Sequence, residues 1–206
     1  MEFAHSDPSV VRSIRQRDLL NTWLRAAARH RPLPLLHDFR PERVADELTD
    51  MMGFDVVGQG DDARFRITQE GATLTITYGS DHIDPAERTN RFLDDAIGPV
   101  RYANVITLYR TCLAHKRPAY SISMVQDADG KDVSYERLLL PFSEGGNLTH
   151  IIASLKTISE DGGFEIRNLM RGSDQLPVAK LRTIIDRELF HRAPGRIPVG
   201  DVLEFG

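Results

Sequence analysis

The stretch that decides the fold is residues 118–159, PAYSISMVQDADGKDVSYERLLLPFSEGGNLTHIIASLKTIS. Two turns, one bearing Gly130 and the other Gly145 and Gly146, separate three segments rich in apolar and β-branched residues. Glycine accepts the positive φ that tight hairpin loops need, so this pattern predicts three consecutive antiparallel strands. A three-stranded sheet needs a cover for one face, and we expect the rest of the chain to supply it.

The composition is that of a globular domain of ordinary size. The chain has 206 residues, of which 41% are hydrophobic and 27% charged, enough to bury a core. A formal net charge of −4 gives no basic bias, so we do not expect a nucleic-acid partner. The single cysteine, Cys112, excludes an internal disulfide and fits a reducing compartment. Because no secretory signal and no long apolar run is present, we expect a cytoplasmic protein with no membrane partner.

Upstream of residues 118–159 the sequence predicts a long helix and a second pair of strands. The helix begins at Pro99, and the spacing of Tyr102, Tyr109 and Cys112 carries it to residue 115. Residues 51–59 and 63–69 flank a short turn and predict a hairpin. Short helical pieces are expected between this hairpin and the long helix.

Two further helices are predicted near the ends of the chain. Residues 8–30 carry an apolar stripe, and we expect its members Leu20, Trp23 and Leu24 to form the interface with the sheet. Residues 174–190 carry a second stripe of the same spacing. The predicted fold class is therefore α+β, with a five-stranded antiparallel sheet, connecting helices on one face and a flanking helix at each end.

That order of elements resembles a PAS domain. Several motifs resemble, in particular, those of a family of small alphaproteobacterial proteins that carry a single divergent PAS domain and little else. The motifs are Trp23 and Leu24 in the first helix, Phe65-Arg66-Ile67 before Gly71, Arg117-Pro118 entering a strand, YERLLLPF at 135–142 and HIIAS at 150–154.

The resemblance covers about residues 17–160 and implies a division of the chain. Residues 1–40 would be an N-terminal helix and linker, 41–160 the PAS-like domain, and 161–206 a C-terminal extension with one helix. It also implies a helix over residues 71–79, although their β-branched content favours a strand on propensity alone.

The resemblance further implies a small-molecule site between the inner face of the sheet and the connecting helices. The candidate ligand-binding residues are Phe65, Ile67, Tyr78, Tyr109, Tyr120, Ile122, Met124 and Tyr135. An ordinary core, with the tyrosine hydroxyls reaching the surface, explains the same residues and is the preferred interpretation of the residue types alone.

The sequence lacks the motifs that bind flavin or zinc in related kinds of site. Cys112 stands late in the long helix, without the Asn-Cys-Arg-Phe-type motif of flavin-binding PAS domains, so we expect no flavin photochemistry. For His82 and His115, the nearest candidates for a haem ligand, loop and helix-end roles are the better explanation, and we expect no haem. The seven histidines show no zinc-site spacing, so no metal is expected. The identity of any cofactor stays open.

The resemblance predicts a non-enzymatic sensory or regulatory module of signal transduction that binds a small molecule, a signalling partner protein or both. Because PAS domains commonly pair through the N-terminal helix and the outer sheet face, a homodimer is expected. The alternative is a small cone-shaped α+β enzyme in which His82, Tyr109 and Tyr135 act as acid and base. A third interpretation is a structural partner protein without a pocket.

Overall fold

The computed structural model describes residues 3–28, 33–42, 44–77, 80, 83–126, 132–144, 146–158, 176–186 and 188. The strands are β1 Ala4–Ser6, β2 Met51–Val57, β3 Arg64–Glu70, β4 Ala119–Gln126, β5 Asp132–Glu144, β6 Asn147–Ile158 and β7 Val178–Ile185. The α-helices are α1 Ile14–Ala28, α2 Val44–Glu47, α3 Ala72–Thr77, α4 Leu93–Ile97 and α5 Pro99–His115. Within these described ranges, no helix is long and apolar enough to cross a lipid bilayer.

The predicted three-stranded meander is confirmed. β4 pairs antiparallel with β5, and β5 pairs antiparallel with β6. The predicted hairpin is also confirmed as β2 and β3, and β2 continues the sheet by pairing with β6. The long helix runs over the predicted residues, Pro99–His115. The local patterns of these segments therefore agree with the tertiary structure.

Helix α3 confirms the helix implied for residues 71–79 over the described residues Ala72–Thr77. Threonine in a helix can bond its hydroxyl to the carbonyl one turn earlier. Here Thr75 Oγ1 donates to the Gly71 carbonyl at 3.0 Å and Thr77 Oγ1 to the Thr73 carbonyl at 2.8 Å. These bonds satisfy the hydroxyls inside a helix that β-branched content alone would disfavour.

The predicted five-stranded antiparallel sheet is wrong. The chain is α+β, but its sheet is mixed and has seven strands in the order β1-β7-β4-β5-β6-β2-β3. β7 pairs antiparallel with β4, and β1 pairs parallel with β7. The C-terminal helix predicted over 174–190 is also wrong, because the described part, Val178–Ile185, is strand β7. Its β-branched residues Thr183, Ile184 and Ile185 are buried in pairing that outweighs the helical spacing.

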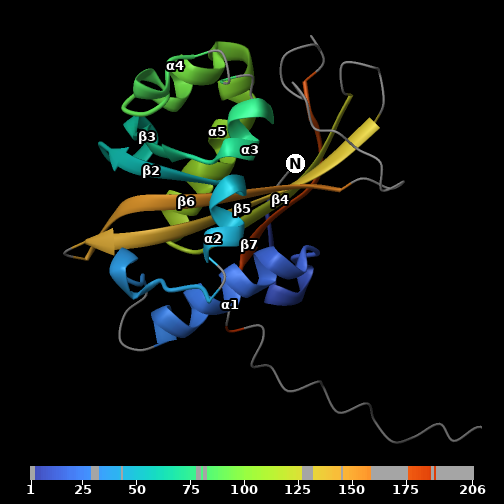
Figure 1. Cartoon of the computed structure of the whole chain (residues 1–206). Helices are drawn as coiled ribbons and strands as arrows, with labels where there is room; N and C mark the ends of the chain where they lie inside the picture. The colour runs from blue at the N-terminus through green and yellow to red at the C-terminus, as the bar shows by residue number, and fades with distance from the viewer. Residues whose placement is uncertain are drawn as a thin grey trace, which may run out of the picture.

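Helices lie on both faces of the sheet (Figure 1). α3, α4 and α5 lie on one face, and α1 lies on the other. The N-terminal helix is also shorter than predicted, because Pro8–Val10 forms a separate 3-10 turn and α1 begins at Ile14. Central strand β5 is therefore covered on both sides, and nearly all of its residues are buried.

Helix α1 packs on the sheet through its predicted apolar stripe. Leu20 and Trp23 are buried, and Leu24 is partly buried against the core. Trp23 Nε1 donates a hydrogen bond to the carbonyl of Pro141 in β5 at 2.7 Å. A buried indole N–H needs such an acceptor, so this bond fixes the position of α1 on the strand.

A buried polar cluster fixes the beginning of α1. The Tyr120 hydroxyl donates to Glu136 Oε2 at 2.5 Å, and the backbone N–H of Ser13 donates to the same oxygen at 3.1 Å. Gln16 Nε2 donates to the Ser154 carbonyl at 2.9 Å. Burial and the Glu136 hydrogen bond both raise the pKa of Tyr120. The side chain of Glu136 thus holds α1 to the sheet from β5.

Candidate ligand-binding cavity

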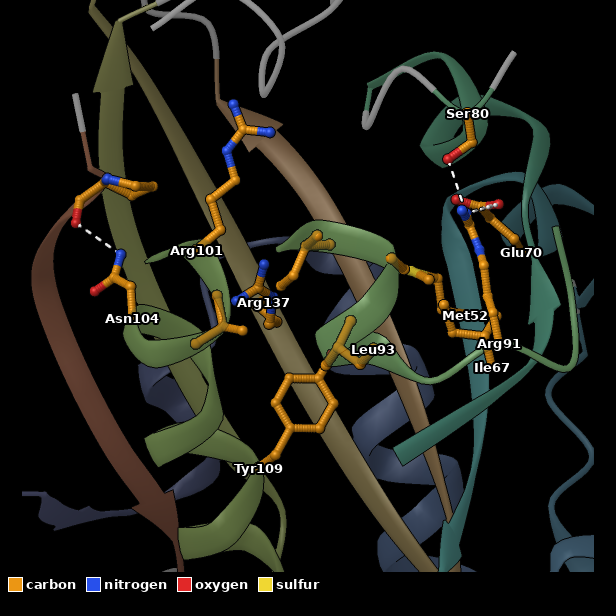
Figure 2. A pocket seen from close by; sticks show the side chains of 14 residues that line it. Met52, Ile67, Glu70, Ser80, Arg91, Leu93, Arg101, Asn104, Tyr109 and Arg137 are labelled. Carbon is orange, nitrogen blue, oxygen red and sulfur yellow. Dashed lines mark hydrogen bonds and ion pairs between the residues drawn. The ribbon is translucent and has the colours of Figure 1, made fainter. Parts of the chain in front are cut away.

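A cavity lies between the sheet and helices α4 and α5 (Figure 2). Its volume is about 40 Å³, which is room for about three or four water molecules. The apolar part of its wall consists of Met52, Ile67, Leu93, Ala96, Ile97, Val105, Tyr109 and Pro177. The polar part consists of Glu70, Ser80, Arg91, Arg101, Asn104 and Arg137.

The angle between α4 and α5 sets the helical wall of the cavity. Gly98 ends α4 and begins α5 with φ of 75° and ψ of 164°, a conformation that a residue with a Cβ rarely adopts. Beneath this wall, the Tyr109 ring packs edge-on against Phe54, with centroids 5.3 Å apart. It also lies 5.1 Å from the Phe65 ring. The helix is therefore anchored to β2 and β3 by aromatic contacts.

An ionic cluster closes one side of the cavity. The Arg91 guanidinium lies 3.5 Å from Glu70 Oε2 and donates to Ser80 Oγ at 3.0 Å. Arg91 Nε donates to the Arg88 carbonyl at 3.1 Å. The Glu70 side chain is only 2% exposed, and this burial raises its pKa although the charge of Arg91 opposes the shift. A buried carboxylate with a raised pKa in a cavity wall is a feature of functional sites.

We expect Glu70→Gln to remove a pH-dependent part of the stability. Because the folded-state pKa of Glu70 is raised above the ordinary 4.5, the folded chain takes up this proton at higher pH than the unfolded chain. This group therefore adds stability as the pH falls from the raised pKa towards 4.5, and that contribution is lost as the pH rises through the raised pKa. Urea unfolding is measured between neutral pH and pH 4.5. The free energy of unfolding of wild type should rise relative to that of the variant as the pH falls.

The matched control for this prediction is Glu87→Gln, which removes a carboxylate from an exposed position. Its stability should run parallel to that of wild type over the same pH range. If the Glu70→Gln curve also runs parallel to wild type, Glu70 does not have a raised pKa in the folded protein.

Two further arginines bring positive charge to the cavity. Arg137, from central strand β5, is buried, with its guanidinium carbon 5.7 Å from the centre of the Tyr135 ring. Arg101 lies in the first turn of α5 and is partly exposed. Over the part of the chain that the structure describes, Arg101 makes no hydrogen bond or ion pair. Among the described lining residues, three thus carry a guanidinium group and one carries a carboxylate.

Pro177, directly before strand β7, completes the described wall of the cavity. Asn104 Nδ2, in α5, donates to the Pro177 carbonyl at 3.2 Å. An Arg182 NH2 group, in β7, donates to the Asn104 carbonyl at 3.3 Å. The segment that the sequence assigns to a helix is therefore a structural part of the wall.

The predicted ligand-binding residues on the α5 face are only partly brought together. Ile67 and Tyr109 line the cavity. Phe65 is buried beside the Tyr109 ring, and Tyr135 is buried in β5 two residues before Arg137. Tyr78 lies outside the described residues.

The other three predicted residues lie on the opposite face of the sheet. The Tyr120 hydroxyl meets Glu136 beneath α1, and Ile122 is the direct neighbour of Glu136 across β4 and β5. Since side chains alternate along a strand, Met124 belongs to the same α1 face. The structure therefore does not place Tyr120, Ile122 and Met124 in the cavity.

The charged residues of the cavity are those that sequence reasoning missed. Glu70, Arg91, Arg101 and Arg137 each stand among polar neighbours or at an element end, where charge usually means a solvated surface. Arg137 alone gives a usable signal, because YERLLLPF places it directly before an apolar run within a predicted strand. A charged residue in such a buried strand needs a polar contact in the core.

The histidines and the cysteine show no catalytic grouping in the described structure. His82 lies outside the described residues, so its convergence with Tyr109 and Tyr135 stays a prediction. His115 packs edge-on against His5, with ring centroids 5.5 Å apart. Burial raises the pKa of the Cys112 thiol, which donates to the Arg117 carbonyl at 3.3 Å. Among the described residues, no three His, Cys, Asp or Glu side chains are grouped to hold a metal ion.

No protein-family model matches the chain. A search of curated proteins also finds no match. What this protein binds therefore has to be inferred from its own cavity.

Proposed function

We propose that this protein is a non-enzymatic regulatory module that binds a small molecule in the cavity between the sheet and helices α4 and α5. The observation that carries the proposal is the make-up of the cavity wall, which combines eight apolar residues with six polar ones among the described residues. Ligand sites in proteins have this make-up. A volume of about 40 Å³ limits the occupant to a few non-hydrogen atoms unless the walls move.

The sequence motifs add support for a sensory role. The resemblance of YERLLLPF and HIIAS to divergent PAS proteins supports signalling, and kinship with that family stays a prediction. The seven-stranded mixed sheet is not the sheet that the resemblance implied, so the proposal depends on the cavity. A homodimer and a signalling partner protein likewise stay predictions.

Two consecutive residues of β5 give the cavity a connection to the opposite face. Arg137 lines the cavity, and Glu136 accepts the hydrogen bond from the Ser13 backbone at the start of α1. Consecutive side chains of a strand point to opposite faces. A ligand that moves Arg137 would therefore also move the anchor of α1, and the bound protein would favour a different packing of that helix. This link supports a regulatory role over simple storage of a ligand.

The proposal is tested by filling the cavity. Ala96→Phe places a large side chain in the α4 wall, and the control Ala114→Phe adds the same side chain at an exposed position of α5. Native mass spectrometry of protein purified from its source should show a bound small molecule in wild type and in Ala114→Phe, and none in Ala96→Phe. Polypeptide mass alone in every preparation, or a ligand that Ala96→Phe retains, would contradict the proposal.

A further inference from the structure

We infer that the ligand of the cavity is a short-chain monocarboxylate, with its carboxylate at Arg101 and its alkyl chain against the apolar wall. The inference rests on the proposed function, because it names the chemical class that the same cavity takes. Three features of the cavity support it: the charge of its wall, the N–H donors of Arg101 and its small volume.

The charge of the wall favours an anion. Glu70 and Arg91 lie 3.5 Å apart and compensate each other, and Arg91 also donates to Ser80. Arg101 then adds a positive charge, and no further carboxylate stands among the described lining residues. Because an arginine stays protonated at all physiological pH values, the positive charge of Arg101 is permanent.

Arg101 supplies the donors that a carboxylate needs. Within the described ranges its guanidinium has neither a hydrogen bond nor an ion pair. A guanidinium presents a planar fork of N–H groups that matches the two oxygens of a carboxylate. Figure 2 shows Arg101 extending from α5, on the other side of Leu93 from the cluster of Glu70 and Arg91. The anion would therefore lie away from the carboxylate of Glu70.

The apolar wall and the small volume fix the rest of the ligand. Leu93, Ala96 and Ile97 come from α4, and Ile67 and Val105 complete an apolar surface that an alkyl chain would cover. About 40 Å³ holds roughly three or four water-sized groups, close to the four non-hydrogen atoms of acetate and the five of propanoate. A second carboxylate or a long chain does not fit this volume.

The test compares propanoate with its neutral isostere propanamide and with inorganic phosphate. The full chain is titrated with each, and binding is followed by the NMR shifts of the methyl groups of Ile67, Ile97 and Val105. We expect propanoate to bind at least about tenfold more tightly than propanamide, since a hydrogen bond to a charged partner is lost with the amide. Phosphate is expected to bind more weakly than propanoate, because it has no group for the apolar wall.

Variants of Arg101 give the second arm of the test. Arg101→Gln should raise the Kd for propanoate about tenfold or more, and Arg101→Lys should restore part of the loss. The control Arg110→Gln makes the same change on the same helix but outside the cavity, and should leave the Kd unchanged. Folding of each variant is checked from its unperturbed methyl spectrum.

Several outcomes would overturn the inference. If propanamide binds as tightly as propanoate, or if Arg101→Gln binds propanoate as wild type does, the carboxylate assignment is wrong while a small-molecule site remains. If phosphate binds more tightly than propanoate, the cavity is a site for inorganic anions. If none of the three compounds shifts the cavity methyls, the carboxylate assignment is wrong, and native mass spectrometry decides separately whether any molecule occupies the cavity.

Discussion

Gly71→Ala is expected to lower the free energy of unfolding by roughly 3 kcal/mol. Gly71 is buried at the start of α3, and a Cβ at this position would overlap the carbonyl oxygens of Leu48 and Thr49. These are backbone atoms and cannot turn aside as a side chain would. Gly71 is also held from both sides, because its N–H donates to the Met51 carbonyl at 2.9 Å and its own carbonyl accepts from the Thr75 N–H at 2.9 Å. The added methyl must therefore displace α3.

This prediction is checked by urea unfolding monitored by circular dichroism. The control is Ala72→Ser, an addition of one atom at the neighbouring exposed position, which should change the stability by less than about 0.5 kcal/mol. A Gly71→Ala protein within about 1 kcal/mol of wild type would mean that α3 does not pack this closely on residues 48 and 49.

Trp23→Ala is expected to lower the free energy of unfolding by about 3–5 kcal/mol. Trp23 is 3% exposed, and its Nε1 hydrogen bond to the Pro141 carbonyl measures 2.7 Å. The substitution removes a large apolar surface from the interface of α1 with the sheet and also leaves that carbonyl without its donor. Trp23→Phe keeps a ring but loses the bond, so we expect an intermediate loss.

The unfolding of these variants must be followed by circular dichroism, because Trp23 is the only tryptophan of the chain. The control on the same helix is Ile14→Ala, whose side chain is 72% exposed and whose loss should cost less than about 0.5 kcal/mol. Equal effects at Trp23 and Ile14 would contradict the described packing of α1 on β5.

The sequence predicts elements well where the local pattern and the tertiary contacts agree. Helix α5 is one example, since it has its own periodicity. The strands of the meander are another, since they are rich in apolar and β-branched residues and are separated by glycine turns. β1 has only three residues, too few for a pattern. β7 pairs with β4 and β1 across long sequence separations. Such long-range pairing cannot be read from the local sequence of the strand. The apolar spacing of this segment fits a helix as well as a strand, so the helix prediction failed there.

The candidate site was predictable only in its position between the sheet and the helices. Residues 119–123 of β4 are all buried, and a strand buried on both faces has no alternation to distinguish them. The sequence alone therefore does not show that the Tyr120 hydroxyl meets Glu136 under α1. Glu70 and Arg91 are separated by 21 residues, and their pairing in the cavity wall follows only from the fold.

The most direct test of the cavity as a binding site is to locate a bound molecule by contacts to the methyl groups around it. Full-length protein with methyl-labelled isoleucine, leucine and valine is saturated with propanoate, and nuclear Overhauser effects from the ligand are assigned. We predict contacts to Ile67, Leu93 and Ile97, which line the cavity, and none to Leu20, which is buried in helix α1 on the other face. Contacts to Leu20 without contacts to the cavity residues would contradict the proposed site.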